Sequence, residues 1–297
     1  MKTILLDLDN IVPFESKTSL CLGNFDGVHL GHQKIINEAV LNSPVEVAVL
    51  TFDAPLGTVI DHRKSKQVLT SVSDRFRLIH RLGAHYLLVL HLEPRLLAMT
   101  AEEFIEKVLK VLNIDKLFLG EDFRFGKNRF GDADLLKKYF PVEVVPLFDV
   151  QHHKVSSSEI VDYLKRGDVI KANELLGRHY QMHGTITEGL HNGQTIGYPT
   201  ANLTLSAPYV IPKFGVYKTV CYIDGFPHLS LTNVGVHPTI QQLDMPSIEV
   251  HIPNYEGNDY GKTMYLEFIS FLRPEKHFAS LDELRKQIAM DIALLKP

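Results

Sequence analysis

Short apolar runs alternate with longer stretches of helical spacing along the first half of the chain. Residues 45–52 are mostly apolar and rich in valine, with only Glu46 and Thr51 between them, which favours a strand buried on both faces. Residues 74–82 instead place apolar side chains at helical intervals. Further strands are expected at residues 20–23, 86–90, 116–119 and 142–146, and further helices at residues 35–41 and 101–112. This alternation predicts an α/β domain with a Rossmann-like parallel sheet and helices on both faces.

Capping residues precede several of the expected helices. Thr100 and Glu103 have the spacing of a capping box. Asp168 is placed to cap a helix over residues 169–175, which Gly177 would end. Ser156 and Glu159 also have the spacing of a capping box, and two short helices are expected over residues 156–177. Ser280 and Glu283 have the same spacing and would begin a terminal helix over residues 281–295.

The pattern changes after about residue 180. The chain becomes rich in threonine, tyrosine, valine and glycine, and short strand-like runs are separated by frequent turns. Short strands with many turns are typical of a small β-barrel. We therefore place a domain boundary near residue 181. An α/β domain is expected over residues 1–181, and a small β-barrel with a terminal helix over residues 182–297.

The composition indicates a globular protein of two domains. The 297 residues suit two domains, and 45% hydrophobic with 22% charged residues is ordinary for a globular chain. A net charge of −4 argues against a nucleic-acid partner. Cys21 and Cys221, the two cysteines, fit no metal or disulfide framework. The first ten residues do not have the charged and then apolar pattern expected of a signal peptide, and no apolar stretch approaches the roughly 20 residues that span a bilayer. A cytoplasmic protein without a membrane partner is expected, of undetermined oligomeric state.

Residues 23–32, Gly-Asn-Phe-Asp-Gly-Val-His-Leu-Gly-His, follow directly after an expected strand. Ligands of parallel sheets bind at the carboxyl ends of the strands, where helix N-termini point. Gly23 and Gly27 would let phosphates approach the backbone amides. His29 and His32 would share one face of the first helical turn and could donate hydrogen bonds to a nucleoside triphosphate. For a His-x-x-His spacing alone, a strand–turn–helix junction with two surface histidines is the simpler interpretation.

The full string resembles the signature of the His-x-Gly-His nucleotidylyltransferases, and in particular that of the bacterial bifunctional riboflavin kinase/FAD synthetase family. Residues 101–105, 120–126 with Gly131, and 167–169 with 175–180 are similar to further segments of that family in the same order. The resemblance implies transfer of AMP from ATP to FMN, giving FAD and pyrophosphate. It implies His29 and His32 as catalytic residues, Gly23, Phe25, Asp26, Gly27, Gly31 and Asp122 as nucleotide-binding residues, and Phe123 as a flavin-binding residue.

Two motifs of that family are changed in this domain. The family has Pro-His-Pro after its Thr-Phe strand, whereas Asp53 here is followed by Ala54, Pro55 and Leu56. The family also has a Ser-Ser-Thr-x-Ile-Arg motif, and Val161 stands in place of its arginine. An arginine fork brings phosphate a charge and a bidentate geometry that valine cannot supply. A riboflavin kinase with a catalytically weakened N-terminal domain is therefore an alternative hypothesis.

Residues 197–203, Gly-Tyr-Pro-Thr-Ala-Asn-Leu, open the expected barrel. In an extended chain Thr200 and Asn202 point the same way, because side chains alternate with a period of two. A hydroxyl and an amide carbonyl are hard oxygen ligands that suit Mg²⁺. For residues 199–202 alone, however, a threonine and an asparagine in a plain turn are the simpler interpretation. The segment resembles the Pro-Thr-Ala-Asn motif of riboflavin kinases, which implies that Thr200 and Asn202 hold the metal and ATP. Gly189 is expected to bind the nucleotide as well.

A later strand alternates isoleucine and valine with Glu249 and His251. Glutamate on such a strand usually faces solvent, but a carboxylate facing a cavity could act as general base for an alcohol. Glu-x-His followed by residues 255–261 is similar to the catalytic-glutamate segment of riboflavin kinases, which implies that Glu249 is the base. Residues 215–217, 233–239 and 272–275 resemble further kinase segments, the last of which implies that Arg273 contacts flavin or phosphate. Gln194 and His237 stand where basic residues are common in the family.

Three hypotheses follow from these residues. The first is an enzyme of FMN and FAD biosynthesis that phosphorylates riboflavin with ATP and Mg²⁺ and then adenylylates FMN. The second is a riboflavin kinase whose N-terminal domain is weakened. The third is a non-enzymatic paralogue that binds flavin or nucleotide and has a regulatory role. We adopt the first, with ATP, riboflavin, FMN and FAD as substrates or products and Mg²⁺ as the cofactor.

Overall fold

A computed structural model of the chain describes residues 1–54, 67–146, 149–150, 153–188, 196–236 and 246–295. Its contacts divide the chain into two compact units, Met1–Ser157 and Ser158–Pro297, here named the N-terminal unit and the C-terminal unit. Each unit is described by itself below.

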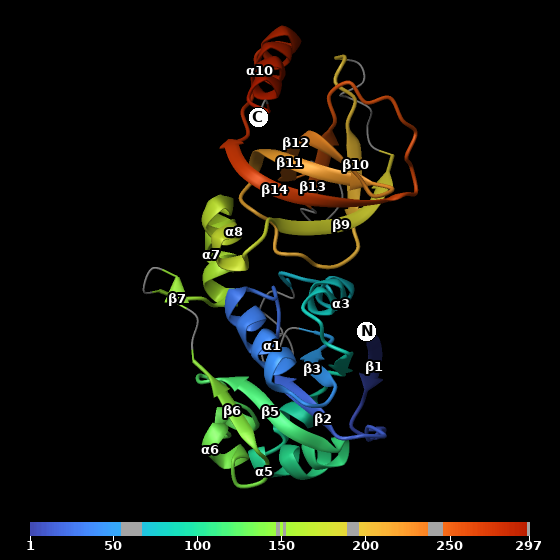
Figure 1. Ribbon diagram of the computed structural model, residues 1–297. Helices are drawn as coiled ribbons and strands as arrows, with labels where there is room; N and C mark the ends of the chain where they lie inside the picture. Colours follow the sequence, from blue (N-terminus) through green and yellow to red (C-terminus); the bar gives the residue numbers. More distant parts are fainter. Residues whose placement is uncertain (55–66, 147–148, 151–152, 189–195, 237–245, 296–297) are drawn as a thin grey trace. The chain divides into compact units, whose positions relative to one another are not determined.

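The N-terminal unit is built on a six-stranded parallel sheet (Figure 1). Its strand order is β1-β4-β3-β2-β5-β6. The strands are β1 (Lys2–Leu6), β2 (Thr18–Leu22), β3 (Val47–Phe52), β4 (Tyr86–Leu90), β5 (Ile114–Gly120) and β6 (Val142–Val145). From β2 the chain builds outward through β3 and β4, and it then returns to the other side of β2 with β5. The strand order therefore reverses between β2 and β5, which is where such sheets form ligand crevices.

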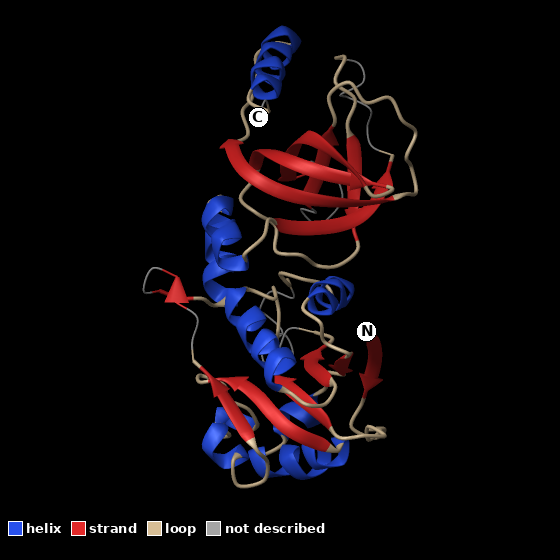
Figure 2. Ribbon diagram, in the orientation of Figure 1, coloured by secondary structure: helices blue, strands red, loops and turns tan. Residues whose placement is uncertain are grey.

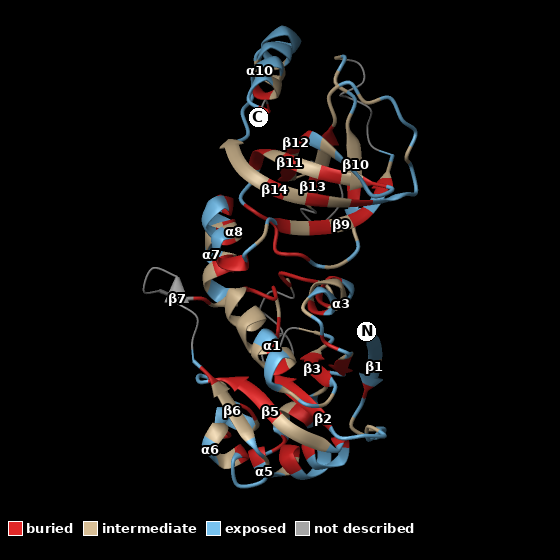
Figure 3. Ribbon diagram, viewed as in Figure 1, coloured by how far each residue is buried: buried red, intermediate tan, exposed pale blue. Residues whose placement is uncertain are grey.

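Apolar side chains cover both faces of this sheet. In β2, Leu20 and Leu22 enter one apolar cluster whereas Cys21 enters another, and the same alternation recurs in β3, β4 and β5. Helices α1 (Leu30–Asn42) and α3 (Val72–Arg81) contribute to the cluster of Cys21. The segment from α4 (Pro94–Ala98) onward contributes to the other. Buried residues accordingly follow the strands in Figure 3, and the expected doubly covered parallel sheet is confirmed.

The helix expected over residues 101–112 is present, but it is not regular. It begins as α5 (Ala101–Phe104), continues as a π-helical turn (Ile105–Leu109) and ends as a 3₁₀ turn (Lys110–Leu112). The capping box is confirmed, since Thr100 Oγ1 accepts from the Glu103 amide at 3.2 Å and the Glu103 carboxylate accepts from the Thr100 amide at 3.0 Å. The remaining short elements of this unit are η3 (Lys127–Arg129), α6 (Ala133–Leu136), β7 (Asp149–Val150) and β8 (His153–Lys154).

The C-terminal unit contains a closed antiparallel barrel of six strands, shown in red in the upper part of Figure 2. Its order around the barrel is β10-β13-β12-β11-β14-β9. The strands are β9 (Tyr180–Thr187), β10 (Ala201–Leu205), β11 (Gly215–Ile223), β12 (Phe226–Val236), β13 (Pro246–His251) and β14 (Thr263–Arg273). Closure pairs every strand on both sides, which confirms the small barrel expected from the frequent turns.

Three helices accompany the barrel: α7 (Ser157–Arg166), α8 (Val169–Leu176) and α10 (Leu281–Ala293). Asp168 caps α8 by accepting from the Lys171 amide at 3.2 Å, and Gly177 ends it in a left-handed conformation. Because α8 packs on β9 and β14, the contacts group both α7 and α8 with the barrel. The structural division thus falls after Ser157, the first residue of α7, whereas the sequence pattern placed the domain boundary near residue 181.

The structure also contains elements that the sequence pattern did not indicate. Strand β1 pairs with β4 at the edge of the sheet, and the short helices α4 and α6 follow β4 and β5. These segments are too short for either period to stand out. None of the helices in the described part of the chain is long and apolar enough to cross a membrane.

Candidate functional sites

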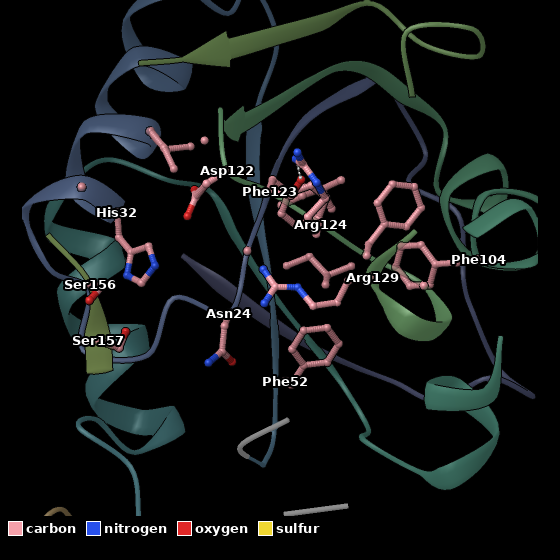
Figure 4. A pocket seen from close by; sticks show the side chains of 18 of the residues that line it. Asn24, His32, Phe52, Phe104, Asp122, Phe123, Arg124, Arg129, Ser156 and Ser157 are labelled. Atoms are coloured by element: carbon pink, nitrogen blue, oxygen red, sulfur yellow. Dashed lines mark hydrogen bonds between the residues drawn. The ribbon is translucent and has the colours of Figure 1, made fainter. Parts of the chain in front are cut away.

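A cavity of about 880 Å³ opens at the carboxyl ends of β2 and β5 (Figure 4). Leu22, Gly23 and Asn24 line it from the end of β2, and Gly120 and Asp122 line it from the end of β5. This is the point at which the strand order reverses, so the cavity lies where an open α/β sheet binds its ligand.

Two stacked histidines stand at the start of α1 in the wall of this cavity. His29 is the N-cap, and its Nδ1 accepts a hydrogen bond from the His32 amide at 3.4 Å. The two ring centroids lie 3.6 Å apart with the planes 18° from parallel. Both residues line the cavity, together with Gly31, whose added Cβ would lie 3.2 Å from the His29 ring. The first turn of α1 carries no acidic residue, so no carboxylate within that turn offsets the positive end of the helix dipole, which attracts anions.

The turn between β2 and α1 has an unusual backbone. Phe25, Gly27 and Val28 all have positive φ, at 51°, 83° and 42°. Positive φ is costly for phenylalanine and valine and persists only where the surroundings impose it. Here both side chains are fully buried, beneath the α1 face of the sheet. The described lining of the cavity includes none of these three residues, so they shape the turn that carries the histidines.

Asp26 fastens this turn to residues 69–70. Its carboxylate accepts from the Leu69 amide at 3.1 Å, the Thr70 amide at 3.0 Å and the Thr70 hydroxyl at 3.1 Å. The Ser157 hydroxyl donates to the Asp26 carbonyl oxygen at 2.9 Å. Burial raises the pKa of Asp26, while these donors and the nearby Arg75 act in the opposite direction. The Asp26 side chain thus stabilises the turn, and it is not part of the described cavity lining.

Arg75 of α3 connects two parts of the cavity wall through hydrogen bonds. It is 2% exposed and donates to Thr51 Oγ1 and, at 2.7 Å, to the Phe52 carbonyl oxygen. Thr51 Oγ1 in turn donates to the Asn24 carbonyl oxygen at 2.6 Å. Phe52 and Asn24 both line the cavity. This link was not predictable from the sequence, because Arg75 lies on an ordinary amphipathic helix.

Aromatic rings form another part of the cavity wall. Phe125 lies with its ring centroid 5.7 Å from those of both Phe104 and Phe123, and all three line the cavity. Phe52 also lines it, from the end of β3. Figure 4 shows Phe52 and Phe104 on one side of the cavity and His32 on the other. Of these rings, only Phe123 was singled out by the sequence.

Cationic side chains also reach the cavity from the loop after β5. They are Arg124, Lys127 and Arg129, and none was identified from the sequence, although residues 124–129 read Arg-Phe-Gly-Lys-Asn-Arg. Ser156 and Ser157 line the cavity near His32 in Figure 4. Pro55 and Leu56, where a family histidine is missing, lie outside the described residues.

A second group of predicted residues meets on the barrel. Asn202 of β10 is paired in register with Glu249 of β13, and Glu249 is paired on its other side with Asn233 of β12. Side chains of directly paired residues emerge on the same face of a sheet. The Ser247 hydroxyl donates to the Glu249 carboxylate at 3.3 Å, and the Asn233 amide donates to Glu275 at 3.4 Å. A carboxylate thus stands between two amides in one row across three strands.

Thr200 lies directly before β10, next to this row. The His251 ring donates to the Pro199 carbonyl oxygen at 2.8 Å, and the His251 and Tyr198 rings meet edge to face at 5.5 Å. These contacts fix the chain around Thr200 against β13. Within the described residues, no three histidine, cysteine or acidic side chains gather as metal ligands. The oxygen atoms of Thr200 and Asn202 are nonetheless of the type that Mg²⁺ takes when phosphates and waters complete its shell.

Arg273, at the end of β14, is held by an ion pair with Asp291 of α10. Its Nη2 donates to Asp291 Oδ2 at 2.8 Å, and its Nε donates to the same carboxylate at 3.0 Å. Asp291 is 2% exposed and also accepts from the Gln287 amide at 2.9 Å. The Arg273 guanidinium lies 5.9 Å from the Phe278 ring centroid. The predicted residue Gly189, like Gln194 and His237, lies outside the described residues.

Comparisons with known proteins cover both units. A family model described as FAD synthetase matches residues 12–159, and one described as riboflavin kinase matches residues 176–296. Proteins named bifunctional riboflavin kinase/FMN adenylyltransferase are similar over nearly the whole chain. The protein of Listeria monocytogenes is 32% identical, and the match covers 92% of this chain and 89% of that protein. The protein of Bacillus subtilis is 33% identical, and the match covers 93% of this chain and 91% of that protein. A crystal structure described as a macrolide-efflux protein from Streptococcus pneumoniae has a TM-score of 0.91 and 28% identity, covering 99% of this chain and 98% of that one.

Proposed function

Because the chain belongs to the bifunctional riboflavin kinase/FMN adenylyltransferase family, we propose roles for its residues in those two activities. The chain is an enzyme of flavin biosynthesis: riboflavin and ATP give FMN, and FMN and ATP give FAD. The FAD synthetase match falls on the parallel sheet and the riboflavin kinase match on the barrel. The first of the three hypotheses is therefore supported, and the weakened enzyme and the non-enzymatic paralogue are not.

ATP binds with its phosphates at the start of α1. His29 and His32 line the cavity there, and the positive end of the helix dipole attracts the phosphates. The stacking of the two rings fixes their positions before ATP arrives. The carboxyl ends of β2 and β5, with Gly23 and Asp122, form the rest of the nucleotide site.

The flavin binds against the aromatic part of the same cavity. Phe52, Phe104 and Phe123 offer apolar surface to the isoalloxazine ring, which stacks favourably on aromatic side chains. In the reaction, an oxygen of the FMN phosphate attacks the α-phosphorus of ATP. The bond from that phosphorus to the bridging oxygen breaks, and pyrophosphate leaves with its electron pair. Such a transfer depends on positioning and on charge stabilisation by the histidines rather than on a protein nucleophile.

The barrel row of Asn202, Glu249 and Asn233 carries the kinase reaction. Glu249 takes the proton from the terminal ribityl hydroxyl of riboflavin, whose oxygen attacks the γ-phosphorus of ATP, with ADP as the leaving group. Ser247, which donates to the Glu249 carboxylate, orients this base. Thr200 and Asn202 would hold Mg²⁺, which when bound neutralises the ATP phosphates.

One observation supports this assignment above the others: Asn202 and Glu249 are register partners, so the expected metal ligand and base stand next to each other. The test is to follow the two half reactions separately by chromatography, from riboflavin to FMN and from supplied FMN to FAD. Asn202→Ala should raise the Mg²⁺ concentration needed for half-maximal kinase activity and leave adenylyl transfer unchanged. An unchanged Mg²⁺ dependence would remove Asn202 from the metal site.

We also propose a cytoplasmic location, where ATP and flavins are available, with small molecules as the only substrates. The free cysteines Cys21 and Cys221 are both buried, and burial raises the pKa of Cys221 to about 11. A neutral buried thiol is protected from oxidation but gains nothing from an oxidising compartment. Recovery of the protein in a membrane or periplasmic fraction would contradict this location.

A further inference from the structure

Arg129 is held at the cavity by a loop with a constrained backbone. Asn128 and Arg129 both have positive φ, at 55° and 61°, and Gly126 precedes them at 71°. A Cβ on Gly126 would lie 2.7 Å from the backbone of α5, so glycine is required there. The Lys127 amide donates to the Met99 carbonyl oxygen at 2.7 Å and anchors the loop at its other side. A non-glycine residue with positive φ stores strain and often marks a functional position.

The guanidinium of Arg129 lines the cavity and, within the described parts of the chain, no hydrogen-bond or ion-pair partner engages it. Arg124 in the same loop differs, because it donates to the Phe123 carbonyl oxygen at 2.8 Å. In Figure 4 the Arg129 side chain extends between the part of the cavity with His32 and the part with Phe104. An arginine without a partner in a ligand cavity has its full donor capacity available for an anion.

We propose that Arg129 binds the phosphate of FMN and thereby selects FMN over riboflavin in the N-terminal unit. This inference rests on the proposed adenylyl transfer and assigns it a specificity residue. With the isoalloxazine ring on the aromatic side and the ATP phosphates at the start of α1, the FMN phosphate must lie between them. Arg129 extends into that space.

Charge explains why a cation is needed at this point. The FMN phosphate carries about two negative charges at neutral pH and must approach the α-phosphate of ATP, which is also anionic. A guanidinium between them reduces this repulsion and can fix the phosphate through two parallel hydrogen bonds.

The test compares three variants in the intact chain: Arg129→Gln, Arg129→Lys and, as a charge-matched control, Lys138→Gln, an exposed position outside the cavity lining. FAD formation is measured with FMN varied at saturating ATP, and then with ATP varied at saturating FMN. Loss of a charge-assisted hydrogen bond to phosphate predicts that Arg129→Gln raises the KM for FMN about 10- to 100-fold. The KM for FMN of Arg129→Lys should lie between those of the wild type and Arg129→Gln, and that of Lys138→Gln should equal that of the wild type.

Thermal unfolding of each variant reports whether both units are folded and should match that of the wild type, and the riboflavin kinase activity should also be unchanged. An unchanged KM for FMN in Arg129→Gln would overturn the inference. A rise in the KM for ATP alone would overturn it too, and would assign Arg129 to the ATP phosphates. These failures require a wild type that makes FAD; no FAD from the wild type would instead overturn the proposed adenylyl transfer, and this inference with it.

Discussion

Asn202 and Glu249 face each other as direct partners across the β10–β13 pair, although 46 residues lie between them in the sequence. Asn233 joins them from β12, so the three polar side chains occupy one row across three strands of the barrel. The row is rigid because each member lies on a strand that is paired on both sides. This arrangement makes the kinase site testable independently of the adenylyltransferase cavity.

Glu249→Gln should reduce FMN formation from riboflavin about 100-fold or more, because the amide cannot accept the hydroxyl proton. Formation of FAD from supplied FMN should be unaffected. Chromatographic assays of the two half reactions measure both. Glu256→Gln, an exposed acid on the segment after β13, is the matched control and should retain both activities. An equal loss of both activities in Glu249→Gln would contradict the division of labour between the units.

Variants of His29 should separate its two roles. His29→Ala removes the side chain that caps α1 and should lower the free energy of unfolding by about 0.5–1 kcal/mol. His29→Asn retains a capping oxygen and should keep most of that stability. Both should lose adenylyl transfer, because neither can donate to the ATP phosphates as a histidine does. Urea denaturation and FAD assays provide the two measurements. Full activity in His29→Asn would restrict His29 to a structural role.

The exposed His91 ring should hold its proton more tightly because Asp53 lies beside it. His91 Nδ1 lies 2.5 Å from Asp53 Oδ2, and this hydrogen bond raises the pKa of His91, with weaker contributions from Glu93 and Asp7. Asp53→Asn should therefore lower the pKa of His91 toward its ordinary value, and Glu93→Gln should lower it less. An NMR titration of the imidazole measures both shifts. A His91 pKa that is the same in the wild type and Asp53→Asn would show that the pair does not form in solution.

The raised pKa of His91 also determines how the free energy of unfolding changes with pH. The folded state binds the proton more tightly than the unfolded state, so the stabilisation is complete below the unfolded pKa. It is lost as the pH rises through the higher folded pKa. The stability difference between the wild type and Asp53→Asn should accordingly shrink over that interval, which denaturation at a series of pH values will show.

Asp291→Ala should loosen α10 from the barrel. It leaves Arg273, whose side chain is 14% exposed, without its carboxylate, and a buried pair broken on one side costs about 2–3 kcal/mol here. Kinase activity should fall as well, since Arg273 lies in the segment expected to face the flavin. The control is Asp282→Asn, whose exposed pair with Arg285 should contribute less than about 1 kcal/mol. Thermal unfolding and hydrogen exchange of α10 distinguish the two variants.

The chemistry-bearing residues were predictable where several signals coincided in one short segment. Residues 23–32 combine a strand end, glycines and histidines, and the structure places His29 and His32 in the cavity wall. Within the same string, however, the structure directs Asp26 to the amides of residues 69–70. Sequence spacing does not distinguish a side chain that faces the ligand from one that stabilises the turn, because the motif contains residues of both kinds.

Arg75 and Arg129 could not be found in the sequence for another physical reason. Arg75 acts through Thr51 and Phe52 on a strand about 20 residues earlier, a contact that only the packing of α3 on the sheet creates. Arg129 reaches the cavity because its loop adopts positive φ, a conformation that residue type favours at Gly126 and Asn128 but not at Arg129. Both positions look like ordinary charged residues on exposed segments.

The amino-acid sequence by itself determined the two fold classes, the family and the segments that carry the chemistry, because hydrophobic period, turn residues and local motifs are all short-range properties. Only the tertiary structure decided which residues meet: the register that sets Glu249 between Asn202 and Asn233, and the strand reversal that brings β2 and β5 together around the cavity. Register and strand order depend on pairings between distant segments, whose free energy comes from burial in the complete fold.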